Sequence, residues 1–298
     1  MQQAVLIAKL TSNKGPEAFA EVSKALTDRG ISIVEAHQVE NRKELQKRVR
    51  RAVKSGHKFI IVAGGDGSQA AAVGELAHTD AVLGVIPAGT GNSFAQSLGI
   101  KPSIEDAIDT LLNGRVTQVD LGVVNGTYFA NFATIGLAAQ IGEDTPKLLK
   151  KITGGIAYGL SAMIPILTHK PFKATVRWQK NELKVETFQM IVANGRFFGN
   201  TPILPDATIT DGKLAFFTTA GSGRLENMRM YLAFLQGTQT GLPDAHYFQS
   251  KKITVKTKRK QAVAIDGSSL GTTPAVFEVA RKALNVMVPE DTPAVLAV

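Results

Sequence analysis

The chain has 298 residues, of which 44% are hydrophobic, and a formal net charge of +9. This length exceeds the usual size of one domain, so two domains with ordinary hydrophobic cores are expected. The absence of cysteine excludes a disulfide framework and cysteine-based zinc sites, and it is compatible with a reducing cytoplasm. The positive charge favours an anionic partner, such as a nucleotide, an acidic lipid headgroup or nucleic acid.

The first part of the chain alternates short apolar runs with amphipathic segments. Strands are predicted at residues 5–8, 31–34, 59–63 and 81–86. Helices are predicted to begin at Pro16, at Asn41 and after Ser103, which Asp106 follows at capping-box spacing. This βαβ series predicts an α/β domain with a doubly wound parallel sheet over residues 1–120.

After about Val119 the pattern changes to strand-like runs that are joined mostly by turns. The predicted strands are residues 128–133, 172–179, 183–193, 213–219, 253–258, 262–265 and 275–279. Helices are expected near residues 145–168 and 222–236. The sequence therefore predicts a mainly antiparallel, β-rich second domain over residues 121–287, with the tail 288–298 returning to the first domain.

The most apolar stretch, Ile152 to Thr168, contains three glycines and a proline. A membrane-spanning helix needs about 20 apolar residues, so a buried or interfacial helix is the better interpretation. No signal peptide is recognised at the N-terminus. The expected location is therefore the cytoplasm.

A glycine-rich turn, Gly64-Gly65-Asp66-Gly67-Ser68, lies between an all-apolar strand and a predicted helix. Glycines let a ligand approach the backbone closely, and Ser68 could cap the helix. A helix N-terminus offers free N–H groups and a partial positive charge, which favour phosphate. Because Asp66 would repel a bare phosphate, it suggests a contact bridged by Mg²⁺ or water. An ordinary tight βα turn remains the alternative.

A second turn of the same kind, Gly89-Thr90-Gly91-Asn92-Ser93, follows the predicted strand at residues 81–86. In a parallel sheet both turns open at the carboxyl ends of their strands, where ligands bind. Neither turn is a Walker A loop or a dinucleotide-binding fingerprint. Two such turns on one sheet edge point to a nucleotide site more strongly than one turn does.

The combination of Gly-Gly-Asp-Gly-Ser with Pro-Ala-Gly-Thr-Gly-Asn resembles the diacylglycerol kinase catalytic domain family. This family includes soluble bacterial lipid kinases and sphingosine kinases, and NAD kinases are distant relatives. Further segments follow in the family's order: Val119-Asp120-Leu121-Gly122, Asn131 to Gly136, Val192-Ala193-Asn194-Gly195, Pro205-Asp206-Ala207, Asp211 to Leu214 and Ile265-Asp266-Gly267. The resemblance thus extends over most of the chain.

The resemblance implies that ATP lies between the two domains and that its phosphates rest on the first turn. The implied nucleotide-binding residues are Gly64, Gly65, Asp66, Gly67, Ser68, Gly89, Thr90 and Asn92. Phosphoryl transfer depends mainly on positioning and charge neutralisation, which backbone amides, Mg²⁺ and lysines supply. Asp266 would accept the proton of an attacking lipid hydroxyl. The expected activity is therefore that of an ATP-dependent lipid kinase.

The resemblance also implies two metal sites. Asp66 and Asp120 would hold Mg²⁺ through water. A second, structural metal would bind Asp211 together with backbone oxygens of Thr208 and Lys213, a hard oxygen set. Without the resemblance, Asp211-Gly212 and Asp266-Gly267 are more simply turn pairs.

Several positions depart from the family pattern. Ser93 and Ser268 stand where members often have aspartate and glutamate, so altered activity is one expectation. Ser68 replaces a threonine and keeps its hydroxyl. The family's threonine after the second strand is absent, and His37 lies nearby, where its ring could stack on adenine or simply remain on the surface.

The lipid must come from a membrane, and Lys147, Lys150 and Lys151 flank the apolar residues 152–167. This arrangement suits peripheral contact with an anionic bilayer, as does a basic cluster within residues 251–260. A core helix with a solvated rim is an equal alternative. Nucleic acid is not expected, because the basic residues lack interleaved aromatics.

Two other functions stay open. One is an activity like that of NAD kinases on a soluble nucleotide, and the other is a nucleotide- or lipid-binding protein without catalysis, which Ser93 and Ser268 suggest. The acceptor lipid is not identified by the sequence, and a homodimer is among the oligomeric states left open.

Overall fold

The computed structural model describes residues 3–10, 15–137, 139, 169–198, 201–221 and 223–292. The predicted helix at residues 145–168 lies outside these ranges, as do residues 293–298 of the predicted returning tail. Among the described helices, none is both long and apolar enough to cross a bilayer.

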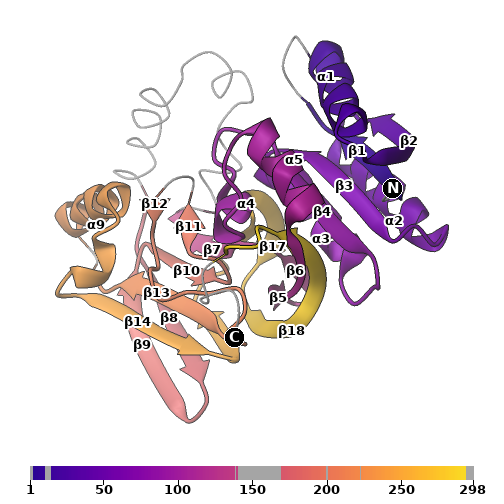
Figure 1. The fold of residues 1–298 in the computed structure, drawn as a ribbon. Coiled ribbons are helices and arrows are strands. Elements are labelled where there is room, and N and C mark those ends of the chain that lie inside the picture. Colours follow the sequence, from indigo (N-terminus) through magenta and orange to yellow (C-terminus); the bar gives the residue numbers. More distant parts are fainter. Residues whose placement is uncertain are drawn as a thin grey trace.

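The N-terminal part is built around parallel strands. These are β1 (Gln3–Ala8), β2 (Ser32–Gln38), β3 (Phe59–Gly64) and β4 (Val82–Pro87), in the spatial order β2-β1-β3-β4. The helices of this part are α1 (Gly15–Asp28), α2 (Arg42–Lys54), α3 (Asp66–Leu76), α4 (Ser93–Ser97) and α5 (Ile104–Asn113). Helices α1 and α5 lie on one face of the sheet, and α2 and α3 on the other (Figure 1). The predicted doubly wound α/β arrangement is confirmed.

The C-terminal part is antiparallel. One six-stranded sheet has the order β14-β13-β10-β7-β16-β17. Its strands are β7 (Phe132–Gly136), β10 (Gln189–Ala193), β13 (Leu214–Thr219), β14 (Ala245–Ser250), β16 (Ala262–Ile265) and β17 (Ser268–Thr272). It faces β8 (Phe172–Trp178), β9 (Asn181–Thr187) and β15 (Lys252–Thr257) across a core that includes Phe129, Phe216 and Phe277. The predicted antiparallel β-rich domain is thus a β-sandwich.

The remaining elements complete the second domain. They are β6 (Thr127–Phe129), the small hairpin β11 (Phe197–Phe198) and β12 (Thr201–Pro202), helix α9 (Arg224–Gln236) and the 3-10 turn η1 (Gln239–Gly241). Helix α9 confirms the helix predicted near residues 222–236.

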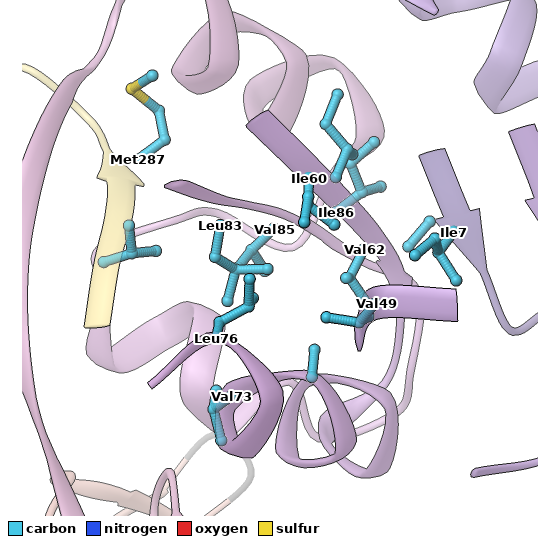
Figure 2. Close-up of a cluster of buried hydrophobic side chains, with 14 of the residues drawn as sticks. Ile7, Val49, Ile60, Val62, Val73, Leu76, Leu83, Val85, Ile86 and Met287 are labelled. Carbon is cyan, nitrogen blue, oxygen red and sulfur yellow. The ribbon is translucent and has the colours of Figure 1, made fainter. Parts of the chain in front are cut away.

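A long strand joins the two domains. β18 (Ala275–Val288) pairs with β15 at its start and lies parallel to β4 near its end, while β5 (Arg115–Val124) pairs along both halves of it. In Figure 1, β18 is the curved yellow strand between the purple and the orange parts. Its last residues, Leu284 and Met287 among them, belong to the N-terminal core. Figure 2 shows Met287 at the edge of the cluster formed by Leu76, Leu83 and Val85.

Two predicted strands are each divided in the structure, and a third is longer than predicted. Residues 183–193 are not one strand, because the chain leaves β9 at Thr187 and enters β10, in the opposite sheet, at Gln189. Residues 128–133 likewise divide between β6 and β7. The strand predicted at residues 275–279 continues to Val288, since β18 keeps its partner β5 through an irregularity between Ala280 and Leu284. Strands β5, β11, β12, β14 and β17 were not predicted.

Candidate active site

The two glycine-rich turns lie side by side at the carboxyl edge of the parallel sheet. β3 and β4 are neighbours, and Gly64 is opposite Pro87 in their register. The amide of Ala88 donates to the carbonyl of Gly64 at 3.1 Å. The predicted meeting of the turns at one edge, where α/β folds bind ligands, is therefore present.

The glycines of these turns allow the turns to touch each other. A Cβ on Gly89 would lie 2.5 Å from Cα of Gly65, and one on Gly64 would lie 2.4 Å from Oγ of Ser68. By contrast, a Cβ on Gly67 would meet nothing within 4 Å. Gly64, Gly65 and Gly89 therefore serve close packing, whereas Gly67 faces the space that a ligand could enter.

Helix α3 begins at Asp66, one residue after Gly65, and no side chain caps it. The prediction that Ser68 caps this helix was wrong, because Ser68 lies within the first turn and is buried. Its amide instead donates to the carbonyl of Gly65 at 2.8 Å. A first helical turn without a side-chain cap leaves its N-terminus suited to an anion.

Asp66 connects the first turn with the second. Its Oδ1 accepts a hydrogen bond from the Phe94 amide at 3.1 Å, and its Oδ2 one from the Ser93 hydroxyl at 3.4 Å. Both donors lie at the start of α4, so the Asp66 carboxylate caps this short helix from a neighbouring turn. Ser93 thus binds Asp66 directly.

Asn92 closes the second turn on itself. It has a left-handed backbone with φ of 51°, and its side chain exchanges two hydrogen bonds of 2.9 Å with the amide and carbonyl of Gly89. Asn92 is buried, whereas Thr90 is exposed at the tip of the turn. Asn92 therefore fixes the shape of the turn, and Thr90 is the side chain that reaches outward.

Asp266 lies in the two-residue turn between β16 and β17, where it has φ of 45° and Gly267 has φ of 74°. Its Oδ2 accepts from the Ala130 amide at 2.7 Å, and its Oδ1 accepts from the amides of Asn131 and Phe132 at 2.9 and 3.1 Å. These bonds hold the carboxylate in one orientation and tie the turn to β7.

The pKa of Asp266 is raised to about 6. Burial is the main cause, the three backbone hydrogen bonds oppose it, and the negative charge of Asp66 adds to the rise. Asp66 and Asp266 belong to different domains, and their carboxylates lie close enough for the charge of Asp66 to raise the pKa of Asp266.

Asp120 is almost fully buried, with 1% of its surface exposed. Its carboxylate accepts hydrogen bonds of 2.7 Å from the amides of Gly212 and Lys282. The Asn194 side chain donates to the Asp120 carbonyl and to that of Ala130, each at 2.9 Å. Hydrogen bonds of Asp120 and Asn194 thus join β5 to the backbone at Gly212, Lys282 and Ala130, where the two domains meet. The sequence included Asn194 only as part of a motif and gave no sign of this role.

The predicted second metal site lies beside Asp120. The pKa of the Asp211 carboxyl is raised, mainly by burial. The Lys213 amide donates a hydrogen bond to this carboxyl at 2.9 Å and opposes the rise, whereas the charge of Asp120 adds to it. Thr208 lies on the same loop, next to Ile209, whose carbonyl accepts from the Asp120 amide at 2.7 Å. Within the described ranges, no three acidic or histidine side chains gather into a metal-binding group.

His37 lies near the end of the edge strand β2, and β1 separates that strand from β3. Its Nε2 is 2.9 Å from Glu35 Oε2, and His57 Nε2 lies 3.3 Å from the other oxygen of Glu35. The hydrogen bond from His37 is the main cause that lowers the pKa of Glu35. The imidazole is therefore held by a neighbour on its own strand.

Comparisons with known proteins agree with this arrangement. Residues 3–124 match the family model described as "Diacylglycerol kinase catalytic domain", and residues 132–288 match that of the "YegS C-terminal NAD kinase beta sandwich-like domain". A protein named diacylglycerol kinase from Bacillus subtilis (strain 168) is 30% identical over 237 residues, which are 78% of this chain and 78% of the relative. A protein of the same name from Staphylococcus epidermidis (strain ATCC 12228 / FDA PCI 1200) is 27% identical over 279 residues, which are 93% of this chain and 87% of the relative.

The fold has solved counterparts. The crystal structure of a diacylglycerol kinase from Bacillus anthracis str. Sterne has a TM-score of 0.75 at 22% identity and covers 99% of this chain and 98% of that chain. A second structure from the same organism has a TM-score of 0.81 at 24% identity. Both domains and their arrangement thus recur in these structures.

Proposed function

Because the chain belongs to the diacylglycerol kinase catalytic domain family, we propose that it transfers the γ-phosphate of ATP to the hydroxyl of a diacylglycerol-like lipid. The observation that carries this proposal is the position of Asp266. Three backbone hydrogen bonds hold this carboxylate of the second domain in place. Its pKa is raised to about 6, and the charge of Asp66 in the Gly64–Ser68 turn contributes to the rise. A fixed carboxylate with such a pKa suits the role of a general base.

The nucleotide would bind at the start of α3. The amides of the first helical turn would hold its phosphates. A Cβ on Gly67 would meet nothing within 4 Å, which would leave room for a phosphate there. Thr90 would add a hydroxyl from the tip of the second turn, whose shape Asn92 maintains. His37 would stack its ring on the adenine, while its Nε2 stays 2.9 Å from Glu35 Oε2.

Asp266 would act through Oδ2. This oxygen accepts one backbone hydrogen bond, whereas Oδ1 accepts two, so Oδ2 keeps a lone pair for a proton. The lipid oxygen bonds to the γ-phosphorus as its proton passes to Asp266, and the bond between that phosphorus and the oxygen of ADP breaks. At neutral pH a carboxyl with a pKa of about 6 is mostly ionised and still basic enough to accept the proton.

The carboxylate of Asp66 is partly exposed and offers the hard oxygens that Mg²⁺ prefers. Asp66 and Asp120 would both hold the ion through water, because the two oxygens of each carboxylate already accept hydrogen bonds. When bound, Mg²⁺ would neutralise phosphate charge. The second metal is proposed at Asp211 with backbone oxygens of Thr208 and Lys213, where a cation would relieve the repulsion from Asp120.

Phosphate transfer from labelled ATP to a panel of diacylglycerol, phosphatidylglycerol, ceramide, a sphingoid base and NAD tests the proposal. We expect transfer to at least one lipid, and a loss of about 10²- to 10⁴-fold in Asp266→Asn with ADP affinity unchanged. Transfer to NAD alone would assign the activity of the NAD kinases. Clear ADP binding without any transfer would contradict a kinase and identify a binding protein.

Peripheral contact with an anionic membrane stays part of the proposal. The residues 147–167 on which it first depended lie outside the described ranges. Lys256, Lys258 and Lys260 are described and exposed, and they lie on β15 and the segment after it. If reversing these three charges leaves binding to acidic vesicles unchanged, this second basic cluster plays no part in membrane contact.

A further inference from the structure

One side-chain hydrogen bond joins α2 to the hairpin that carries Asp266. Nη1 of Arg42 donates to Oγ of Ser268 at 2.6 Å, although the two residues are 226 positions apart in the chain. Arg42 is the first residue of α2 and Ser268 is the first residue of β17, and both are partly buried. The bond therefore crosses from the first domain to the second.

The start of α2 lies at the same edge of the parallel sheet as the Gly64–Ser68 turn. Helices α2 and α3 pack side by side, and each follows a strand of the same parallel sheet, so both begin at its carboxyl edge. Side-chain hydrogen bonds fix this end of α2: the N-cap Asn41 accepts from the Glu44 amide at 3.0 Å, and the Glu44 carboxylate accepts from the Glu40 amide at 3.3 Å.

The other end of the bond is equally fixed. Ser268 pairs with Ile265 across the turn formed by Asp266 and Gly267. The amide of Asp266 donates to the Phe132 carbonyl at 2.9 Å, and its carboxylate is bound to the backbone of residues 130–132. Because the hairpin is fixed within its own domain, a hydrogen bond to Ser268 restrains the distance between the two domains.

Arg42 differs from the other basic residues of α2. Arg50 pairs with Glu75 of α3 at 2.8 Å, and Arg48 approaches Glu44 of its own helix at 4.0 Å. These pairs lie within the first domain, as expected for a solvated basic face. The hydrogen-bond partner of Arg42 is an uncharged hydroxyl two residues after Asp266, in the second domain.

We propose that Arg42 is a positioning residue that sets the separation of Asp266 from the Gly64–Ser68 turn through its hydrogen bond to Ser268. A charge-assisted bond between two fixed ends is stronger than a neutral one and resists small changes in domain separation. The inference rests on the proposed function, because it assigns Arg42 a part in the same phosphoryl transfer.

A double-mutant cycle on Arg42→Ala and Ser268→Ala tests the link. We expect each change to lower kcat by about tenfold, because small misplacements of a base slow transfer strongly. ADP affinity should stay within about twofold, and the double variant should be no slower than either single one, as for residues that act as a unit. Arg42→Lys should be intermediate. Lys43→Ala and Ser269→Ala, which change exposed neighbours, serve as controls.

A distance measurement provides a readout that does not depend on activity. The chain has no cysteine, so Lys47→Cys and Thr272→Cys, at exposed positions of α2 and β17, would carry the only spin labels. We expect the distance distribution between them to broaden in Arg42→Ala and in Ser268→Ala, and not in the controls.

The inference is overturned by unchanged distance distributions, by multiplicative losses in the double variant, or by weaker ADP binding with an unchanged kcat. If the unaltered protein transfers phosphate to no lipid, the proposed function fails. The distance measurement would then decide alone whether Arg42 joins the domains.

Discussion

At the scale of single residues, the carboxylates of the site have structural partners as well as proposed chemical roles. Asp66 caps α4 and Asp266 holds the backbone of residues 130–132. These bonds hold both carboxylates in place, and the charge of Asp66 raises the pKa of Asp266. A site that holds like charges in place favours a cation or a proton between them, as phosphoryl transfer requires.

The activity should rise with pH through about 6, the pKa of Asp266. Below this pH the carboxyl is protonated and cannot accept the proton of the lipid hydroxyl. A pH profile of kcat/KM measures this limb, and Asp266→Asn should lack it. A limb near the ordinary aspartate pKa of 3.8 would show that burial does not raise the pKa of Asp266.

The stability of the protein should depend on the protonation of Asp266 in the opposite direction. The folded protein binds this proton more tightly than the unfolded chain does. The contribution of Asp266 to the free energy of unfolding therefore falls as the pH rises from 3.8 to about 6.

Gly89 and Gly67 should respond differently to alanine. Gly89→Ala forces a Cβ to within 2.5 Å of Gly65 Cα, so we expect a loss of about 1–3 kcal/mol in unfolding free energy. Gly67→Ala meets nothing within 4 Å and should leave the fold intact. If phosphate lies over Gly67, its alanine variant should bind ADP at least about tenfold more weakly, a change of about 1.4 kcal/mol. Urea unfolding measures the stability of the two variants, and ADP titration measures their affinity. Unchanged ADP affinity in Gly67→Ala would argue against phosphate binding at the Gly64–Ser68 turn.

At the scale of elements, the junction depends on a buried carboxylate that accepts hydrogen bonds from two loops. Asp120 at the middle of β5 receives the amides of Gly212 and Lys282, so it orders the loop before β13 and the irregular part of β18. A residue with φ of 50°, as Lys282 has, is tolerated where such bonds hold it.

Asp120→Asn should destabilise the protein. The new amide group would face a backbone N–H in place of an acceptor, and a buried donor without an acceptor costs about 1–3 kcal/mol. Urea unfolding measures the change. Asp80→Asn is the matched control, since the Asp80 side chain is 90% exposed and its ion pair with Lys58 should contribute little. Equal stabilities of the two variants would contradict the anchoring role of Asp120.

At the scale of the whole molecule, β18 contributes side chains to the cores of both domains. Leu284 packs in the N-terminal core, whereas Phe277 of the same strand packs in the β-sandwich. Cores that share a strand should lose structure together.

Leu284→Ala should therefore lower the stability of both domains, by about 2–5 kcal/mol for a fully buried leucine. Trp178 is the only tryptophan, and it stacks on Phe248 in the second domain at 3.7 Å between ring centroids. We expect its fluorescence and far-UV circular dichroism to report one shared transition, shifted in Leu284→Ala. Val116→Ala, at a half-exposed position of β5, should change little. A tryptophan transition that stays in place would show that the domains unfold independently.

Much of the fold could be predicted from local patterns in the sequence. The all-apolar run at residues 59–63, the capping residue Ser103 and the glycine-rich turns each depend on neighbours along the chain, so hydrophobic periodicity and turn chemistry predicted them. The break between β9 and β10 at Phe188 could not be predicted from the sequence. The two strands form one continuous run of residues that favour β-structure, and they differ only in the sheet that each joins.

The sequence by itself determined the two fold classes, the two turns at one sheet edge and the resemblance that names Asp266 as a base. Tertiary structure alone decided that Gly65 and Gly89 touch each other, that Asp66 caps α4, that Asn92 closes its own turn, and that Arg42 reaches Ser268. The physical reason is the range of the interactions. Helices, strands and turns follow from contacts between near neighbours, whereas these bonds and contacts exist only after separate segments have packed together.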